Sequence, residues 1–126
     1  MSTRVLVVDD TSLFRRVITD ALTGIPGVEV AGSASNGKLA LSRLASLQPD
    51  LMTLDLEMPE MGGLELYRRL RVAHPAVKLL FMTGHALAGG GYEELLQAGV
   101  PWLQKPFAVA ALAARVRAAL DGAPDF

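Results

Sequence analysis

Short apolar runs alternate along the chain with longer segments in which apolar residues recur every three or four positions. The continuous runs are typical of strands that are buried on both faces of a sheet. The longer segments have the spacing of amphipathic helices, and glycine or proline follows most of them. The pattern predicts strands at residues 5–8, 28–31, 51–54, 77–82 and 102–104. It predicts helices at residues 12–23, 37–47, 64–73, 92–98 and from about 107 to 121, with Ser12 as the cap of the first.

Strands that alternate with helices predict one α/β domain spanning residues 1–126. Right-handed crossovers between parallel strands place helices on both faces of the sheet. For a chain this short we expect the flavodoxin-like, doubly wound arrangement, with five parallel strands in the order 2-1-3-4-5 and five helices. The carboxyl ends of the strands then meet at one edge, where such sheets keep their chemistry. The polar residues gathered at that edge are Asp9, Asp10, Asp55, Thr83 and Lys105.

Composition narrows the classes of partner. Of the 126 residues 51% are hydrophobic, yet no apolar run approaches the roughly 18 residues of a membrane span. Twelve basic residues against thirteen acidic ones give no field that would attract nucleic acid. We therefore expect neither a membrane nor a nucleic acid as a direct partner. The chain has no cysteine and no signal-peptide pattern after Met1, so we expect a cytoplasmic protein without disulfides or thiolate metal sites.

The polar residues predicted at the carboxyl edge of the sheet are the chemical groups that a phosphoryl-transfer site uses. Three carboxylates in one pocket repel one another unless a cation lies among them. A cluster of Asp without His or Cys favours Mg²⁺ or Mn²⁺ over zinc, because these hard ions prefer oxygen ligands. Lys105 adds a compact positive charge and Thr83 adds a hydroxyl donor. In such a site Asp55 would be the nucleophile and would form an aspartyl phosphate.

Four short motifs resemble, in order and spacing, those of response-regulator receiver domains in two-component signalling. They follow the first, third, fourth and fifth predicted strands, and the resemblance covers nearly the whole chain. The first half is similar to receivers of chemotaxis methylesterases, and the last third to receivers fused to hybrid histidine kinases. The matching pieces are Asp9-Asp10, residues 55–63, Thr83-Gly84 and Lys105-Pro106-Phe107.

The resemblance implies that Asp55 takes a phosphoryl group from a histidine kinase or a phosphotransfer protein. Asp10 and Asp55 would bind Mg²⁺ together with the backbone carbonyl of Glu57. Asp9 would act on the ion through water.

The resemblance also implies a switch. Thr83 and Lys105 would contact the phosphoryl group, and the peptide bond before Pro106 would be cis. Trp102 falls where the family usually has Tyr or Phe as its switch aromatic, although it can equally be a core residue. The surface of the fourth helix, fifth strand and fifth helix would then control a downstream target, an output domain of the same protein, or a second copy in a phosphorylation-dependent homodimer.

Two residues depart from the common pattern of the family. Glu57, two residues after the acceptor, and His85, two after Thr83, would flank the path of attacking water and tune the lifetime of the phosphorylated state. Two other classes of function remain open. One is a small phosphatase with Asp55 as nucleophile and Glu57 as acid, and the other is an inactive interaction scaffold.

Overall fold

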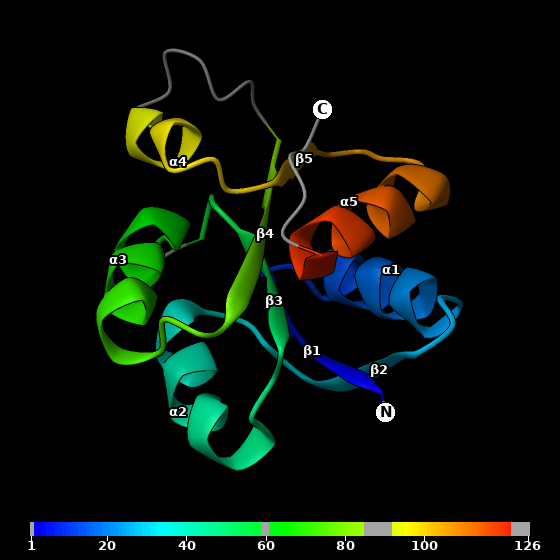
Figure 1. Cartoon of the computed structure of the whole chain (residues 1–126), viewed down its shortest axis with the longest axis horizontal. Coiled ribbons are helices and arrows are strands. Elements are labelled where there is room, and N and C mark those ends of the chain that lie inside the picture. Colours follow the sequence, from blue (N-terminus) through cyan, green and yellow to red (C-terminus); the bar gives the residue numbers. More distant parts are fainter. Residues whose placement is uncertain (1, 59–60, 85–91, 122–126) are drawn as a thin grey trace.

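One parallel sheet holds all the strands of the part of the chain that is described. The structure is a computed structural model, and it describes residues 2–58, 61–84 and 92–121 (Figure 1). The strands are β1 (Thr3–Val8), β2 (Val28–Ala34), β3 (Leu51–Asp55), β4 (Lys78–Thr83) and β5 (Trp102–Gln104). The helices are α1 (Ser12–Thr23), α2 (Gly37–Leu47), α3 (Gly63–Ala73), α4 (Glu93–Gln97) and α5 (Val109–Asp121). None of the helices in these ranges is both long and apolar enough to cross a bilayer.

The strand order confirms the predicted doubly wound fold. The sheet runs β2-β1-β3-β4-β5, and every neighbouring pair is parallel. Across the sheet Val8 is level with Leu54, and Thr83 is level with Gln104. Since β1 and β3 are neighbours at the point where the strand order reverses, the residues that follow them lie beside each other.

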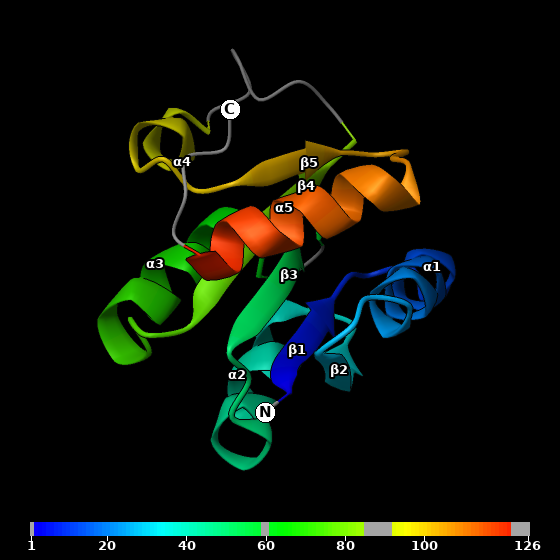
Figure 2. The ribbon, with the colours of Figure 1, turned by 45° about the vertical axis from the view of Figure 1, so that its right-hand side comes forward.

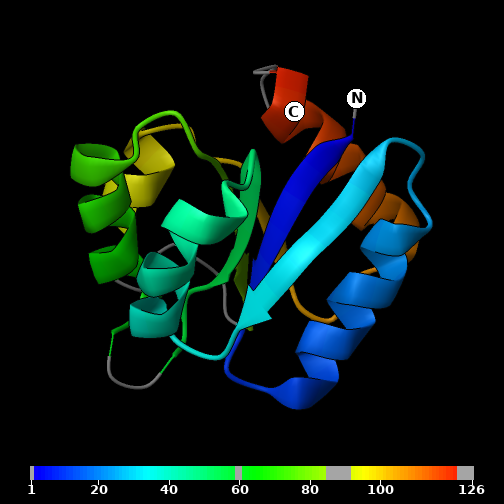
Figure 3. The ribbon, with the colours of Figure 1, turned by 90° about the horizontal axis from the view of Figure 1, so that it is seen from below.

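Alternate residues of each strand pack into two separate apolar layers. Leu6 and Val8 join the first layer with α2, α3 and α4, whereas Val5 and Val7 join the second with α1 and α5. Figure 3 shows α2 and α3 on one side of β1 and β2, and α1 and α5 on the other. Figure 2 shows α5 lying across β4 and β5. Because both faces are covered, the continuous apolar runs of the sequence are fully accounted for.

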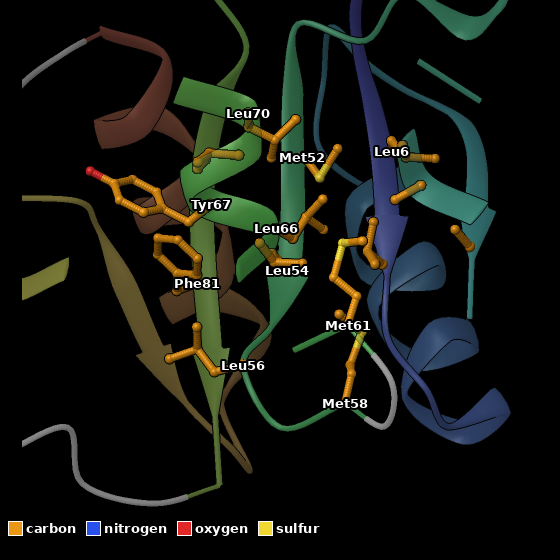
Figure 4. Close-up of a cluster of buried hydrophobic side chains, with 14 of the residues drawn as sticks. Leu6, Met52, Leu54, Leu56, Met58, Met61, Leu66, Tyr67, Leu70 and Phe81 are labelled. Atoms are coloured by element: carbon orange, nitrogen blue, oxygen red, sulfur yellow. The ribbon is translucent and has the colours of Figure 1, made fainter. Parts of the chain in front are cut away.

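The first layer is closed by an aromatic pair between α3 and β4. The rings of Tyr67 and Phe81 meet edge to face with their centroids 5.8 Å apart (Figure 4). Phe81 is 1% exposed, and burying a side chain of this kind contributes roughly 1.5–3 kcal/mol. This packing fixes α3 against the sheet next to the end of β3.

Several helix ends differ from the predictions: α3 begins at Gly63 and not at residue 64, and α5 begins at Val109 and not at about residue 107. The cap of α1 is Thr11 and not Ser12, because Thr11 is the extended residue whose hydroxyl accepts the N–H of Phe14 at 3.2 Å. The helix α4 is shorter than predicted, since Tyr92 lies outside its first turn as the cap. Asn36 caps α2 through its side chain, and Gly99 after α4 has a φ of 71°, the left-handed conformation that glycine commonly adopts at the end of a helix.

Candidate functional site

The carboxyl ends of β1 and β3 deliver three carboxylates to one place. Asp9 follows β1 and is 0% exposed, and Asp55 ends β3 and is 4% exposed. Asp10 is exposed at the mouth. One oxygen from each of the three lies within 4.8 Å of the others. The three acids therefore form a single pocket, although their positions in the sequence are far apart.

Lys105 reaches this pocket from the end of β5. Its Nζ lies 2.7 Å from Oδ2 of Asp9 and 3.4 Å from Oδ2 of Asp55. Its backbone N–H donates to the carbonyl of Thr83 at 2.8 Å, which ties the residue to the end of β4. The peptide bond between Lys105 and Pro106 is cis, in line with the resemblance. One ammonium thus serves two buried carboxylates.

Asp9 is held by bonds on both of its carboxylate oxygens. Its Oδ1 accepts the backbone N–H of Thr11 at 3.0 Å and the Thr11 hydroxyl at 3.1 Å, while Oδ2 accepts from Lys105. Arg15 donates to the Asp9 carbonyl at 2.8 Å. Because both oxygens are engaged, Asp9 is better placed to orient neighbouring groups than to offer a vacant ligand.

Phe14 is a site residue that sequence reasoning missed. The Lys105 ammonium lies 4.2 Å from the centroid of the Phe14 ring, within range of a cation–π attraction. The sequence showed Phe14 only as part of the apolar face of the first helix. The one available signal was an aromatic residue one turn beyond the acid pair.

Burial, and after it the negative charge of Asp9, together raise the pKa of Asp55 from 3.8 to about 7, against the opposing effect of Lys105. The positive charge of Lys105 is therefore too small to neutralise the carboxylates of the pocket. Its donors are all oxygen atoms, which is the set that Mg²⁺ prefers, so the residues present fit this ion.

Glu57 joins Thr83 to the same pocket. The backbone N–H of Glu57 donates to Oδ1 of Asp55 at 3.1 Å. Its side-chain Oε1 accepts the Thr83 hydroxyl and the backbone N–H of Gly84, each at 2.8 Å. The sequence placed Glu57 beside the acceptor, but nothing in it indicated these two bonds.

Two further residues, Trp102 and His85, are predicted to act at the site. Trp102 is half-buried, packs against the first apolar layer, and accepts a bond from Arg115 on its backbone carbonyl at 3.1 Å. This position is compatible with a core residue and with a switch. His85 lies outside the described residues, so its predicted role stays a prediction.

Comparison with known proteins identifies the family. Residues 5–117 match the model of the response regulator receiver domain, and receiver domains bind Mg²⁺ at an acidic pocket of this kind. The chain is 43% identical over 105 residues to a protein-glutamate methylesterase/protein-glutamine glutaminase of Moorella thermoacetica, an alignment that covers 82% of this chain and 24% of the relative. A protein of the same name from Desulfotalea psychrophila is 56% identical over 68 residues, which is 54% of this chain and 19% of the relative.

These relatives confirm the predicted likeness to methylesterase receivers, and the chain spans about a quarter of their length or less. The fold agrees with the response regulator domain of Thermotoga maritima CheB at a TM-score of 0.84 and 28% identity, over 96% of this chain and 98% of that one. Because the family match covers most of the chain and the acidic pocket fits a phosphoacceptor site, the chain belongs to the response regulator receiver domain family and is a signalling domain of two-component systems.

Proposed function

We propose that Asp55 accepts a phosphoryl group from the phosphohistidine of a histidine kinase or a phosphotransfer protein. A carboxylate oxygen of Asp55 attacks phosphorus, an O–P bond forms, and the P–N bond to the donor breaks as its imidazole leaves. The observation that carries this proposal is the convergence of three carboxylates and one lysine, with Lys105 3.4 Å from Asp55.

The residues around Asp55 have separate roles in this proposal. Lys105 neutralises the charge that develops on the transferred group, and Thr83 donates a hydrogen bond to it. Asp10, Asp55 and the backbone carbonyl of Glu57 would hold Mg²⁺, with Asp9 acting through water. The ion, when bound, screens the repulsion between the carboxylates and the incoming phosphoryl oxygens.

The proposed output is a change of binding surface. Thr83 ends β4, and β5 pairs with β4 directly, with Phe81 level with Trp102. A movement of Thr83 toward a phosphoryl group would therefore shift β5 through its pairing with β4. The surface formed by α4, β5 and α5 would change with it. The partner would be a downstream protein, an output domain, or a second copy of this chain.

Glu57 and His85 are proposed to set how long the phosphoryl group persists. The backbone N–H of Glu57 contacts Asp55, and its side-chain carboxylate contacts Thr83 and Gly84, where a carboxylate would repel a phosphate and could also orient water. An unchanged rate of dephosphorylation in a Glu57→Ala variant would contradict this role.

The test is phosphorylation of the purified chain by acetyl phosphate with Mg²⁺, followed by mass spectrometry of the intact protein and of its peptides. We expect one phosphoryl group per chain on Asp55, labile in base and absent from the Asp55→Asn variant. The exposed Asp20→Asn variant is the matched control and is expected to be modified normally.

Sustained release of phosphate without a stoichiometric adduct would instead indicate a phosphatase. No modification of the wild-type chain would indicate an inactive scaffold and would overturn the proposal.

A further inference from the structure

We propose that the Glu57 side chain is an internal competitor for the phosphoryl group, because it occupies the hydrogen-bond donors at the end of β4 that the phosphoryl group needs. The inference rests on the proposed function of Asp55. It assigns a regulatory contact to that site: the receiver is held in its resting state by a carboxylate of its own chain.

The geometry of the contact is that of an anion bound at a strand end. The hydroxyl of Thr83 and the backbone N–H of Gly84 converge on one oxygen, Oε1 of Glu57, at 2.8 Å each. Each of these donors offers a single hydrogen. Bonds to an ionised acceptor are stronger than neutral ones, so Glu57 is a better resting partner than water.

A phosphoryl group on Asp55 would compete for the same donors. Met82 is level with Asp55 across the β3–β4 pair, and Thr83 is the next residue along. The backbone N–H of Glu57 already donates to Asp55 at 3.1 Å, which holds the beginning of the Glu57 side chain next to the acceptor. Two anions at one set of donors repel each other, so phosphorylation requires the Glu57 carboxylate to leave.

The contact is built so that it can be released. The second oxygen of the carboxylate, Oε2, is buried and has no hydrogen-bond partner within the described residues. The side chain is therefore satisfied on one oxygen only, and a competing anion does not have to break a complete network.

Release of the Glu57 carboxylate would also change the electrostatic environment of α4. The pKa of Tyr92, which caps α4, is raised by burial and by the negative charges of Glu57 and Asp55. Tyr92 also packs against the first apolar layer. The negative charge of the Glu57 side chain thus acts on Tyr92 at the start of α4, the helix whose surface is proposed to change.

The test compares Glu57→Ala and Glu57→Gln with the wild-type chain, using beryllofluoride as the phosphoryl mimic at saturating Mg²⁺. Fluorine NMR of the bound mimic measures its affinity, and hydrogen exchange measures protection of the Gly84 amide. Glu65→Gln is the matched control, since Glu65 pairs with Arg69 on the exposed face of α3.

We expect Glu57→Ala to bind beryllofluoride about tenfold more tightly than the wild type, the value of one charged hydrogen-bonded contact. Glu57→Gln keeps an oxygen acceptor but loses the charge, so its affinity should lie between the two. The Gly84 amide should exchange faster in Glu57→Ala before the mimic is added. In a Thr83→Ala background the gain from Glu57→Ala should shrink, because one of the contested donors is gone.

Equal or weaker binding by Glu57→Ala, with normal binding by the wild type, would overturn the competitor role and leave the proposed function standing. Identical gains in Glu57→Ala and Glu57→Gln would also overturn it, because only the charge and not the hydrogen bonding would then matter. No binding by the wild type would overturn the proposed function, and the competitor role with it.

Discussion

Two buried carboxylates in the pocket, those of Asp9 and Asp55, both pair with the ammonium group of Lys105. Asp9 takes the shorter contact, 2.7 Å against 3.4 Å for Asp55. Asp55 is therefore left with burial and a neighbouring negative charge that together raise its pKa to about 7. In the absence of a metal ion, ionisation of Asp55 costs the folded protein free energy.

The metal-free protein should lose stability as the pH rises. The pKa of Asp55 is about 7 in the folded state and 3.8 for an ordinary Asp, so between these values the folded state binds more protons than the unfolded state. The contribution of this group is complete below about pH 4 and is lost as the pH passes 7. Asp55→Asn should therefore stabilise the protein at pH 8 by on the order of 2–4 kcal/mol.

Urea unfolding in EDTA at pH 5 and pH 8 measures this effect. The difference between Asp55→Asn and the wild type should be larger at pH 8 than at pH 5. Asp20→Asn should show no such change. Equal stability of Asp55→Asn and the wild type at pH 8 would show that the pocket tolerates the ionised Asp55 without a metal ion.

At the scale of elements, the start of α3 is packed directly on the loop that carries Asp55. Gly63 begins α3, and its N–H donates to the carbonyl of Leu56 at 3.2 Å. A Cβ at this position would lie 2.7 Å from the Leu56 Cα and 3.0 Å from the Asp55 carbonyl oxygen. The glycine is thus required by the close approach of two backbones, and not by an unusual φ.

Gly63→Ala should destabilise the protein and displace Asp55. Backbone atoms block the added methyl, so the loop must move, at a cost of about 1–3 kcal/mol. Urea unfolding and the rate of phosphorylation by acetyl phosphate should both show the loss. Gly24→Ala is the control, because a Cβ there would lie no closer than 3.6 Å to its neighbours. If Gly63→Ala matched that control in both measurements, the loop would be more adaptable than its packing indicates.

At the scale of the whole molecule, the short edge strand β5 is packed into both apolar layers. Trp102 lies against the first layer and Leu103 belongs to the second. β5 also carries Lys105 to the pocket at its end. Loss of β5 would uncover both layers and remove the counter-charge of Asp9 in one step.

The protein should therefore unfold as one cooperative unit. Trp102 is the single tryptophan of the chain, so its fluorescence reports on β5 alone. We expect the fluorescence transition in urea to coincide with the transition in far-ultraviolet circular dichroism, which follows the helices. A fluorescence transition at lower urea would mean that β5 and its neighbours form a separate, weaker unit.

The local sequence pattern predicted the structure correctly where the conformation depends on a few neighbouring residues. The glycine at position 99 could be interpreted as the end of a helix, because a helix stop depends only on residues within a few positions of it. The prediction of Ser12 as the cap of α1 is wrong, because Thr11 and Ser12 both have a hydroxyl suited to capping and only the extended backbone of Thr11 distinguishes them. The role of Phe14 depends on a lysine on another strand, so no local rule could reveal it.

The sequence by itself determined the alternation of strands and helices, the strand order, and the residues that end β1, β3, β4 and β5. It could do so because apolar periodicity and turn chemistry are local, and because few topologies connect such elements without strain. Only the tertiary structure decided how those residues engage one another. That Lys105 favours Asp9, that Phe14 lies against Lys105, and that Glu57 turns toward Thr83 depend on distances across the sheet, which no spacing along the chain specifies.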